Sequence, residues 1–230
     1  MNRIICVLIG YIFGLFQTGF IYGKMKGIDI RQHGSGNSGA TNTLRTLGTK
    51  AGFIVLFGDA IKCVLAMTLT YFLFGKNEPE YRYLYMIYSA FGAVLGHDYP
   101  FYLNFKGGKG IAVTAGLIIS FGPLYMIVHL LVFAVTFLTT HFVSLGSILI
   151  YLTFLIMTII CGQTGYFNRH GVIIPQNLLT EMYIVIAVMT VIAIWRHRAN
   201  IKRLLTHTES KVYLSRKGQE KSGKKNDDIV

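Results

Sequence analysis

IAVTAGLIISFGPLYMIVHLLVFAVTFLT, residues 111–139, is the stretch that decides the fold. It is longer than the roughly 20 residues that one helix needs to cross the hydrocarbon core of a membrane. Gly122 and Pro123 interrupt it, and this pair breaks or kinks a helix. The stretch is therefore either one long pass or two shorter ones. The number of passes sets the side of the membrane on which the rest of the chain lies.

The remainder of the chain has the same apolar character. Of its 230 residues, 53% are hydrophobic and 14% are charged, which is typical of a polytopic membrane protein. The first run, MNRIICVLIGYIFGLF, is followed by no small-residue cleavage site, so we read it as a retained span. Further apolar runs cover residues 51–75, 83–96, 142–162 and 182–195.

Positive charge settles the number of passes. The net charge of +12 lies mainly in loops 24–50 and 97–110 and in the tail from Arg196, which fits anionic lipid headgroups rather than nucleic acid. All three segments are cytoplasmic only if the chain folds back at Gly122-Pro123. We therefore predict an all-α integral membrane protein of about seven transmembrane helices, some short, with the N-terminus outside and the C-terminus cytoplasmic.

The predicted domain organisation is simple. Residues 1–209 form one membrane-embedded domain, and residues 210–230 form a charged, disordered cytoplasmic tail. The three cysteines lie in apolar runs and have no metal-binding spacing. Asp59 and Lys62 are three residues apart within an apolar run, which predicts a structural ion pair.

Two long polar clusters lie on the predicted cytoplasmic face. GSGNSGATNTLR, residues 34–45, combines glycines that let backbone N–H groups surround an anion with hydroxyl and amide side chains and Arg45. GHDYPFYLNFKGGKG, residues 96–110, is a basic glycine-rich turn that leads into a helix and so favours anion binding. Taken alone, the first could be a flexible loop with a helix cap, and the second a turn that faces lipid headgroups.

Two shorter clusters share this face. Ser144 and Ser147 open a later helix, where they could serve only as caps. In WRHRANIKRLL, residues 195–205, His197 and Asn200 are three residues apart and can face one ligand, whereas the neighbouring arginines are typical of a positive-inside stop. Because four anion-binding elements meet apolar helices at one face, they suit a substrate that carries both a phosphate and a fatty chain.

Other functions leave different patterns. An anion channel or transporter is the main alternative, since it also needs basic loops, but it should place polar residues along several helices. The HxxxxD pattern of soluble-type acyltransferases does not occur after His33, His97 or His170. A phosphatidyltransferase needs several spaced aspartates for metal, and the chain lacks them.

The motifs HGSGNSGATNTLRTLG, GHDYPFYLNFKGGKGIA and RHRANIKRLL, in this order, resemble the three signatures of the bacterial membrane acyl-phosphate:glycerol-3-phosphate acyltransferases, the PlsY type. DAIK at 59–62 and VSLGS at 143–147 also match, and the resemblance covers residues 4–209. It implies transfer of a fatty acyl group from acyl phosphate to the 1-position of sn-glycerol 3-phosphate. The products are lysophosphatidic acid and phosphate, and no metal or cofactor is needed.

The resemblance also implies roles for individual residues. By motif position, the residues that would bind glycerol 3-phosphate and take part in catalysis are Ser35, Arg45, Lys106, His197 and Asn200. The remaining substrate contacts would come from Asn37, Gly39, Ala40, Thr41, Asn42, His97, Gly107, Gly108, Lys109, Gly110 and Ser144. The base that takes the hydroxyl proton could be His197, His97 or, as we favour, a phosphate oxygen of the donor.

The resemblance has further implications and some departures. It implies a monomer in the bacterial cytoplasmic (inner) membrane, with the active site at the cytoplasmic face and an acyl phosphate supplied by another enzyme. His141 stands where the family usually has arginine, and His207 where it usually has glycine. The loop 163–181 is longer than usual, and the residues beyond Glu209 are an extension.

Overall fold

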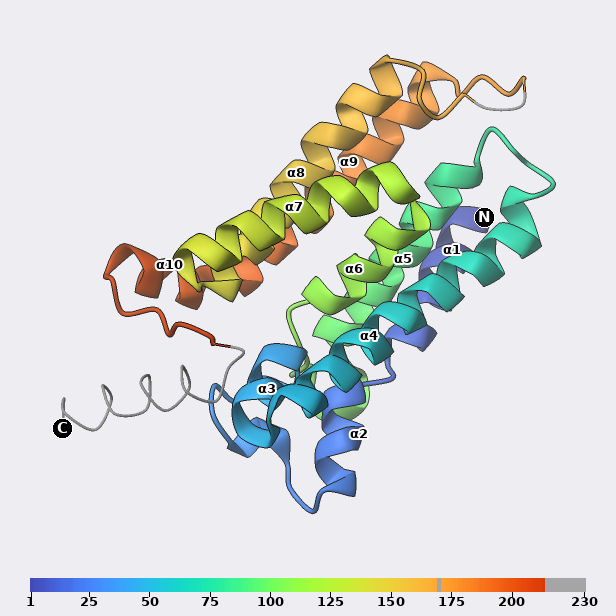
Figure 1. The fold of residues 1–230 in the computed structure, drawn as a ribbon. Coiled ribbons are helices and arrows are strands. Elements are labelled where there is room, and N and C mark those ends of the chain that lie inside the picture. The colour runs from blue at the N-terminus through green and yellow to red at the C-terminus, as the bar shows by residue number, and fades with distance from the viewer. Residues whose placement is uncertain (169–170, 214–230) are drawn as a thin grey trace.

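A computed structural model of the chain describes residues 1–168 and 171–213, in which every regular element is a helix (Figure 1). Most of the tail predicted to be disordered, residues 214–230, lies outside this description. Short 3₁₀ turns occur at Ile30–Gln32 and Phe101–Leu103, and a π-helical turn at Tyr71–Gly75. The α-helices are α1 (Asn2–Gly14), α2 (Thr18–Met25), α3 (Ala40–Leu47), α4 (Thr49–Thr70), α5 (Arg82–Asp98), α6 (Ile111–Ser120), α7 (Pro123–Thr140), α8 (Val143–Gln163), α9 (Gln176–Arg196) and α10 (Arg198–Leu205).

The predicted break at Gly122-Pro123 is confirmed. Helix α6 ends at Ser120 and α7 begins at Pro123, a position where the missing N–H of proline costs no helical hydrogen bond. Gly122 has φ 104°, a conformation that side chains other than glycine rarely adopt. The chain turns back here, so that α7 and α6 run in opposite directions (Figure 1).

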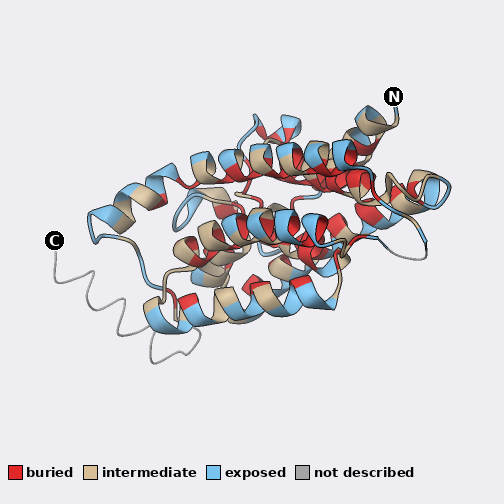
Figure 2. Ribbon diagram, turned by 90° about the horizontal axis from the view of Figure 1, so that it is seen from above, coloured by how far each residue is buried: buried red, intermediate tan, exposed pale blue. Residues whose placement is uncertain are grey.

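Among the residues that the structure describes, five segments are long and apolar enough to cross a membrane: Asn2–Met25, Thr49–Gly75, Pro123–Thr140, Val143–Gln163 and Gln176–Arg196. Helix α6 is apolar but shorter. Figure 2 shows buried residues facing inward and exposed ones facing outward along the helices. Many of the outward side chains are large and apolar, such as Leu130 and Ile156, so the rim is suited to lipid rather than to water.

Helices α1 and α5 pack closely because each carries two glycines four residues apart. These are Gly10 and Gly14 in α1, and Gly92 and Gly96 in α5. A Cβ atom at Gly10 would lie 1.8 Å from the Ser89 carbonyl oxygen. The small-xxx-small pattern is common where membrane helices approach backbone to backbone. The close contact holds the C-terminal end of α5, which carries His97, against the turn after α1.

The end of the bundle that carries the N-terminus has its own polar contacts. Arg3 of α1 binds both carboxylate oxygens of Glu181 in α9, at 2.5 and 2.7 Å. The hydroxyl of Tyr88 in α5 donates to the same carboxylate at 2.7 Å. Three helices are thereby joined at this end, and the other end is left to the polar loops.

Candidate active site

The four predicted polar clusters meet around one cavity. It lies between the start of α3, the end of α5, the start of α8 and the junction of α9 with α10. Most of the predicted site residues line it: Ser35, Asn37, Gly39, Ala40, Thr41, Asn42, Arg45, His97, Lys109, Gly110, Ser144, His197 and Asn200. Ser147, Arg203 and Glu209 also face it.

Three predicted residues of the glycine-rich turn do not line this cavity. Lys106 is exposed, whereas Gly107 and Gly108 are buried, and none of the three is among the residues that line the cavity. The N–H of Gly108 donates to the His97 carbonyl at 3.1 Å, and a Cβ at Gly108 would lie 2.0 Å from Nε2 of His97. The two glycines therefore allow the turn to pass against His97.

Asn42 organises the first polar loop. Its amide nitrogen donates to the carbonyls of Ile30, His33 and Asn37 at 2.8–3.0 Å. Its Oδ1 accepts the backbone N–H of Ser35 at 2.8 Å. Asn42 is buried, and its amide is satisfied by the loop itself. It therefore shapes the loop that presents Ser35 to the cavity.

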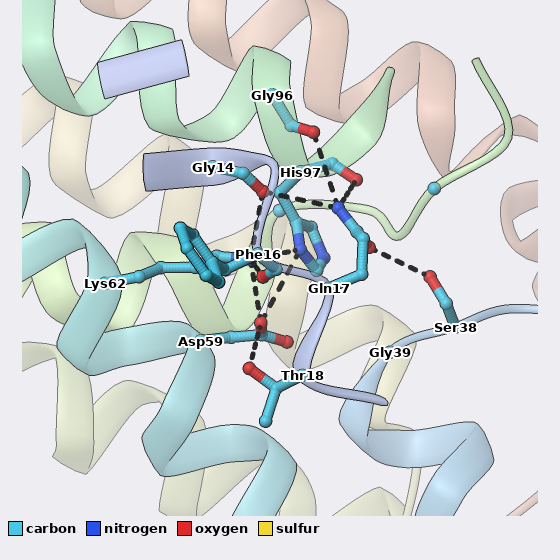
Figure 3. A network of polar contacts seen from close by, with 12 residues as sticks. Gly14, Phe16, Gln17, Thr18, Ser38, Gly39, Asp59, Lys62, Gly96 and His97 are labelled. Carbon is cyan, nitrogen blue, oxygen red and sulfur yellow. Dashed lines mark hydrogen bonds and ion pairs between the residues drawn. The ribbon is translucent and has the colours of Figure 1, made fainter. Parts of the chain in front are cut away.

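His97 is held by a buried polar network (Figure 3). Lys62 lies 2.8 Å from Asp59 and 2.9 Å from Nδ1 of His97, and it donates to the Phe16 carbonyl at 2.6 Å. The predicted ion pair of Asp59 and Lys62 is thus confirmed. An ammonium group can only donate, so Nδ1 of His97 accepts and Nε2 carries the ring proton.

Gln17 extends this network to the first polar loop. Its amide nitrogen donates to the His97 carbonyl at 2.9 Å, and its oxygen accepts from the Ser38 hydroxyl at 3.2 Å (Figure 3). Both side chains are buried. Gln17 was not predicted, because it directly follows the run MNRIICVLIGYIFGLF and belongs to no motif. It ties the turn after α1 to the two loops that build the cavity.

The ring of His197 has the opposite arrangement. Its Nδ1 lies 2.8 Å from the Ala193 carbonyl, which can only accept, so Nδ1 carries the proton and Nε2 is left as an acceptor. Burial lowers the pKa of His197 to about 4, although the bond to Ala193 opposes the shift. The ring is therefore neutral near pH 7 and is a weak base.

Lys109 lies beside His197 and donates to the Asn200 side-chain oxygen. Burial lowers the pKa of Lys109 to about 8, and the positive charges of Arg203, Arg196 and Arg45 act in the same direction. Glu209 opposes this shift. Because burial removes water from the Lys109 ammonium, an incoming anion that pairs with it would stabilise its charged form.

Two further cavities adjoin the polar one and share residues with it. The first, here called the cationic mouth, is an open cavity whose lining includes five cationic side chains: Arg45, Lys109, Arg196, Arg203 and Lys211. Their electric field attracts anions. The second is a groove of about 450 Å³, lined almost entirely by apolar side chains of α3, α4, α6, α7 and α8. Ala40, Thr41, Ile111 and Val143 line both the groove and the polar cavity.

The fold and the site together define a membrane enzyme class, and comparison with known proteins agrees with it. Residues 4–207 match the family described as glycerol-3-phosphate acyltransferase. The chain belongs to this family, as its resemblance to the PlsY type predicts.

Individual relatives cover nearly the whole chain. The glycerol-3-phosphate acyltransferase of Bacillus subtilis (strain 168) is 39% identical over 209 residues, which are 90% of this chain and 95% of the relative. That of Alkaliphilus metalliredigens (strain QYMF) is 38% identical over 213 residues, which are 92% and 97%.

Two solved structures share the fold. Both are of PlsY, an integral membrane glycerol 3-phosphate acyltransferase. The glycerol 3-phosphate form has a TM-score of 0.75 and 32% identity, and the match covers 93% of this chain and 96% of that one. The lysophosphatidic acid form has a TM-score of 0.76 and 30% identity, with coverage of 93% and 97%.

Proposed function

We propose that this chain transfers a fatty acyl group from acyl phosphate to the 1-position of sn-glycerol 3-phosphate. The observation that carries the proposal is the continuity of the three cavities. A cationic mouth suits a small soluble phosphate, and an apolar groove suits a fatty chain. The polar cavity between them is where a hydroxyl and an acyl carbonyl would meet.

The proposed reaction forms one carbon–oxygen bond, breaks another and transfers one proton. The 1-hydroxyl oxygen attacks the acyl carbonyl carbon, the bond from that carbon to the phosphate oxygen breaks, and the hydroxyl proton leaves with the phosphate. The products are 1-acyl-sn-glycerol 3-phosphate and phosphate. Because the donor is already activated, positioning of the reactants and stabilisation of negative charge would supply most of the rate.

The two histidines support a division of roles. Nε2 of His197 can accept a hydrogen bond from a glycerol 3-phosphate hydroxyl and so orient it, but a pKa of about 4 makes this ring a poor proton acceptor. A phosphate oxygen of the donor is the better base. The N–H at Nε2 of His97 can donate to the acyl phosphate, where negative charge develops.

Further binding roles follow the family motifs. We assign the glycerol 3-phosphate subsite to Ser35, Arg45, His197 and Asn200. The acyl-phosphate head would lie near Asn37, the Gly39–Thr41 backbone, Gly110 and Ser144, with Lys109 between the two. Lys106 is exposed and lines none of the three cavities, so we expect it to act on arriving anions at long range.

The same proposal includes placement in the cell. Seven passes, with α5 and α6 as the short ones, put the N-terminus outside and the polar cavity at the cytoplasmic face of a bacterial cytoplasmic membrane. There the enzyme would act as a monomer within a domain of residues 1–209. It would depend on another enzyme that forms acyl phosphate.

A donor comparison tests the activity. Purified protein in detergent is given glycerol 3-phosphate and either palmitoyl phosphate or palmitoyl-CoA, with EDTA present. We expect equal amounts of phosphate and lysophosphatidic acid from palmitoyl phosphate, and no product from the CoA ester. Activity with the CoA ester, or with neither donor, would contradict the proposal.

A further inference from the structure

Arg196 ends α9 and binds the glycine-rich turn that joins α5 to α6. Its Nη2 donates to the Gly107 carbonyl at 3.1 Å and also to the Gly108 carbonyl. The guanidinium lies 5.0 Å from the centre of the Tyr99 ring, and Nε is 3.8 Å from a carboxylate oxygen of Asp98. Only 19% of the side chain is exposed. The sequence alone suggests a positive-inside stop for this arginine, but the structure holds it against the turn.

The two carbonyl contacts fix the direction in which the N–H groups of the turn point. In a trans peptide the C=O and N–H bonds point to opposite sides. The peptide from Gly107 to Gly108 follows this rule, because its carbonyl accepts from Arg196 and its N–H donates to the His97 carbonyl at 3.1 Å. By the same geometry, the contact of Arg196 with the Gly108 carbonyl directs the N–H of Lys109 away from Arg196.

The N–H groups from Lys109 onward are free to bind a ligand. Among the residues that the structure describes, none accepts a hydrogen bond from the N–H of Lys109, Gly110, Ile111 or Ala112. All four residues line the polar cavity, and the last two open α6. The first N–H groups of a helix have no partner within it and favour anions. This row of donors therefore suits a phosphate oxygen.

The orientation of this row needs support, because glycine leaves it adjustable. Gly108 has no Cβ, so the peptide that joins it to Lys109 can rotate at little steric cost. After such a rotation a carbonyl oxygen would take the place of the Lys109 N–H, and this oxygen would repel a phosphate. Arg196 binds the same carbonyl and so opposes the rotation.

We propose that Arg196 is a positioning residue for the acyl-phosphate subsite. It holds the carbonyls of Gly107 and Gly108, and the N–H groups at the start of α6 are thereby kept in place for the phosphate of the donor. Arg196 acts through the turn and not by contact with the substrate. The identity of the phosphate rests on the proposed function, whereas the clamp on the turn is defined by its own contacts.

The affinity for a non-hydrolysable palmitoyl phosphonate tests the proposal without turnover. It is measured by calorimetry in detergent on the full-length wild type and on Arg196→Lys, which keeps the positive charge. The lysine nitrogen ends about where the guanidinium carbon lies, one bond short of Nη2, so it does not reach both carbonyls. We expect Arg196→Lys to bind the phosphonate about tenfold more weakly, as for the loss of one hydrogen bond to a charged group.

Arg198→Lys is the matched control, because it makes the same change two residues further along the chain. Arg198 is exposed and donates to the Trp195 carbonyl, with no contact to the turn among the described residues. Its phosphonate affinity should equal that of the wild type. Equal affinities of Arg196→Lys and the wild type would overturn the proposal, and so would an equal loss in Arg198→Lys.

Balancing the charge of Asp98 is the alternative role for Arg196. The Asp98 carboxylate is buried, and Arg196 lies beside it. Arg196→Gln is therefore compared with the double variant Arg196→Gln, Asp98→Asn, in which no charge is left to balance. A positioning role predicts that the double variant binds the phosphonate as weakly as Arg196→Gln. Recovery of the wild-type affinity would make Arg196 a counter-ion and sink the positioning role.

A measurement on the wild type decides the matter even if the Arg196 variants do not fold. Labelling glycine carbonyls with ¹³C and lysine with ¹⁵N selects the Gly–Lys peptides in NMR spectra: Gly23-Lys24, Gly75-Lys76, Gly108-Lys109 and Gly223-Lys224. Lys109→Arg identifies the third signal by its loss. We expect palmitoyl phosphonate to shift this signal and to leave those of Gly23-Lys24 and Gly75-Lys76 in place. An unmoved Gly108-Lys109 signal would contradict the proposal.

Steady-state kinetics separate this proposal from the proposed function. We expect Arg196→Lys to raise the KM for palmitoyl phosphate and to leave the KM for glycerol 3-phosphate unchanged. A rise in the KM for glycerol 3-phosphate alone would refute the proposal, since Arg196 would then serve the acceptor. If no protein turns over but phosphonate binding weakens in Arg196→Lys alone, the positioning role is supported and the proposed reaction fails. Turnover with unchanged phosphonate affinity removes the positioning role alone.

Discussion

At the scale of single residues, the chemistry of the cavity depends on which atoms carry protons. His97 and His197 are both buried, yet Lys62 fixes one ring as a donor at Nε2 and the Ala193 carbonyl leaves the other as an acceptor. Neither assignment can be made from sequence, because both depend on contacts made in the folded bundle. The motifs predicted that both histidines would lie at the site, but not which ring nitrogen of each would carry the proton.

Replacing His197 tests its role as an acceptor. We expect His197→Ala to raise the KM for glycerol 3-phosphate about tenfold, equivalent to the loss of a hydrogen bond of about 1.4 kcal/mol, with little change in kcat. His197→Gln, which can place an acceptor oxygen near the position of Nε2, should recover part of the loss. A large fall in kcat at unchanged KM would instead make His197 the base.

The pH dependence of kcat/KM reports on Lys109. A lysine is charged below its pKa, and the pKa of Lys109 is about 8 in the free protein. We therefore expect kcat/KM for glycerol 3-phosphate to fall as the pH rises through about 8. The range from pH 7 to 9.5 lies above the phosphate ionisation near pH 6, so that ionisation does not interfere.

The control for this profile is Lys109→Arg, since a guanidinium stays charged throughout the range. Its kcat/KM should be lower at pH 7, because arginine cannot reproduce the bond to Asn200 in the same space, but nearly flat up to pH 9.5. An alkaline fall of the same midpoint in Lys109→Arg would assign the ionisation to another group.

At the scale of elements, glycines allow loops and helices to approach neighbouring segments closely. Gly108 lies against His97, and the glycine pairs of α1 and α5 bring two backbones together. The glycine-rich motifs were predicted to bind anions, and Gly110 does line the cavity. Gly107 and Gly108 allow the turn to pack against His97, and their predicted contact with a substrate stays a prediction. His207 has φ 56°, the conformation for which the usual glycine is suited.

The contact of α1 with α5 predicts sensitivity to one methyl group. A Cβ at Gly92 would lie 2.0 Å from the Val7 carbonyl oxygen, so the helices must move apart in Gly92→Ala. We expect a loss of about 1–3 kcal/mol in stability, seen as a lower midpoint of thermal unfolding in detergent. Leu8→Ala is the control, because Leu8 of α1 is 55% exposed and should change the midpoint little. Equal midpoints for Gly92→Ala and the wild type would contradict this packing.

At the scale of the whole molecule, the sequence predicted the helical membrane class and the fold-back at Gly122-Pro123, because helix length and helix-breaking residues act locally. It also predicted most residues of the polar cavity, since their motifs sit at helix ends. It did not predict Gln17 or Glu209. Each belongs to no motif, and each reaches the site through contacts between distant segments.

The orientation in the membrane is open to a labelling test. A membrane-impermeant maleimide is applied to intact cells that express Lys76→Cys or Lys26→Cys. We expect labelling of Lys76→Cys, whose loop is predicted outside, and labelling of Lys26→Cys only after the cells are opened. The native cysteines Cys6, Cys63 and Cys161 are buried and serve as the background. Labelling of Lys26→Cys in intact cells would show that the chain has the opposite orientation in the membrane.

The most direct test of the central claim, that the polar cavity joins a phosphate subsite to an acyl groove, is photocrosslinking. The probe is a non-hydrolysable palmitoyl phosphonate with a diazirine at the end of its chain, and the labelled residues are located by mass spectrometry. We predict labels on the groove residues Phe53, Ile119, Met126 and Phe133, which are lost when excess palmitoyl phosphate is added. Labels confined to the outer faces of α8 and α9, or labels that palmitoyl phosphate does not displace, would contradict the account.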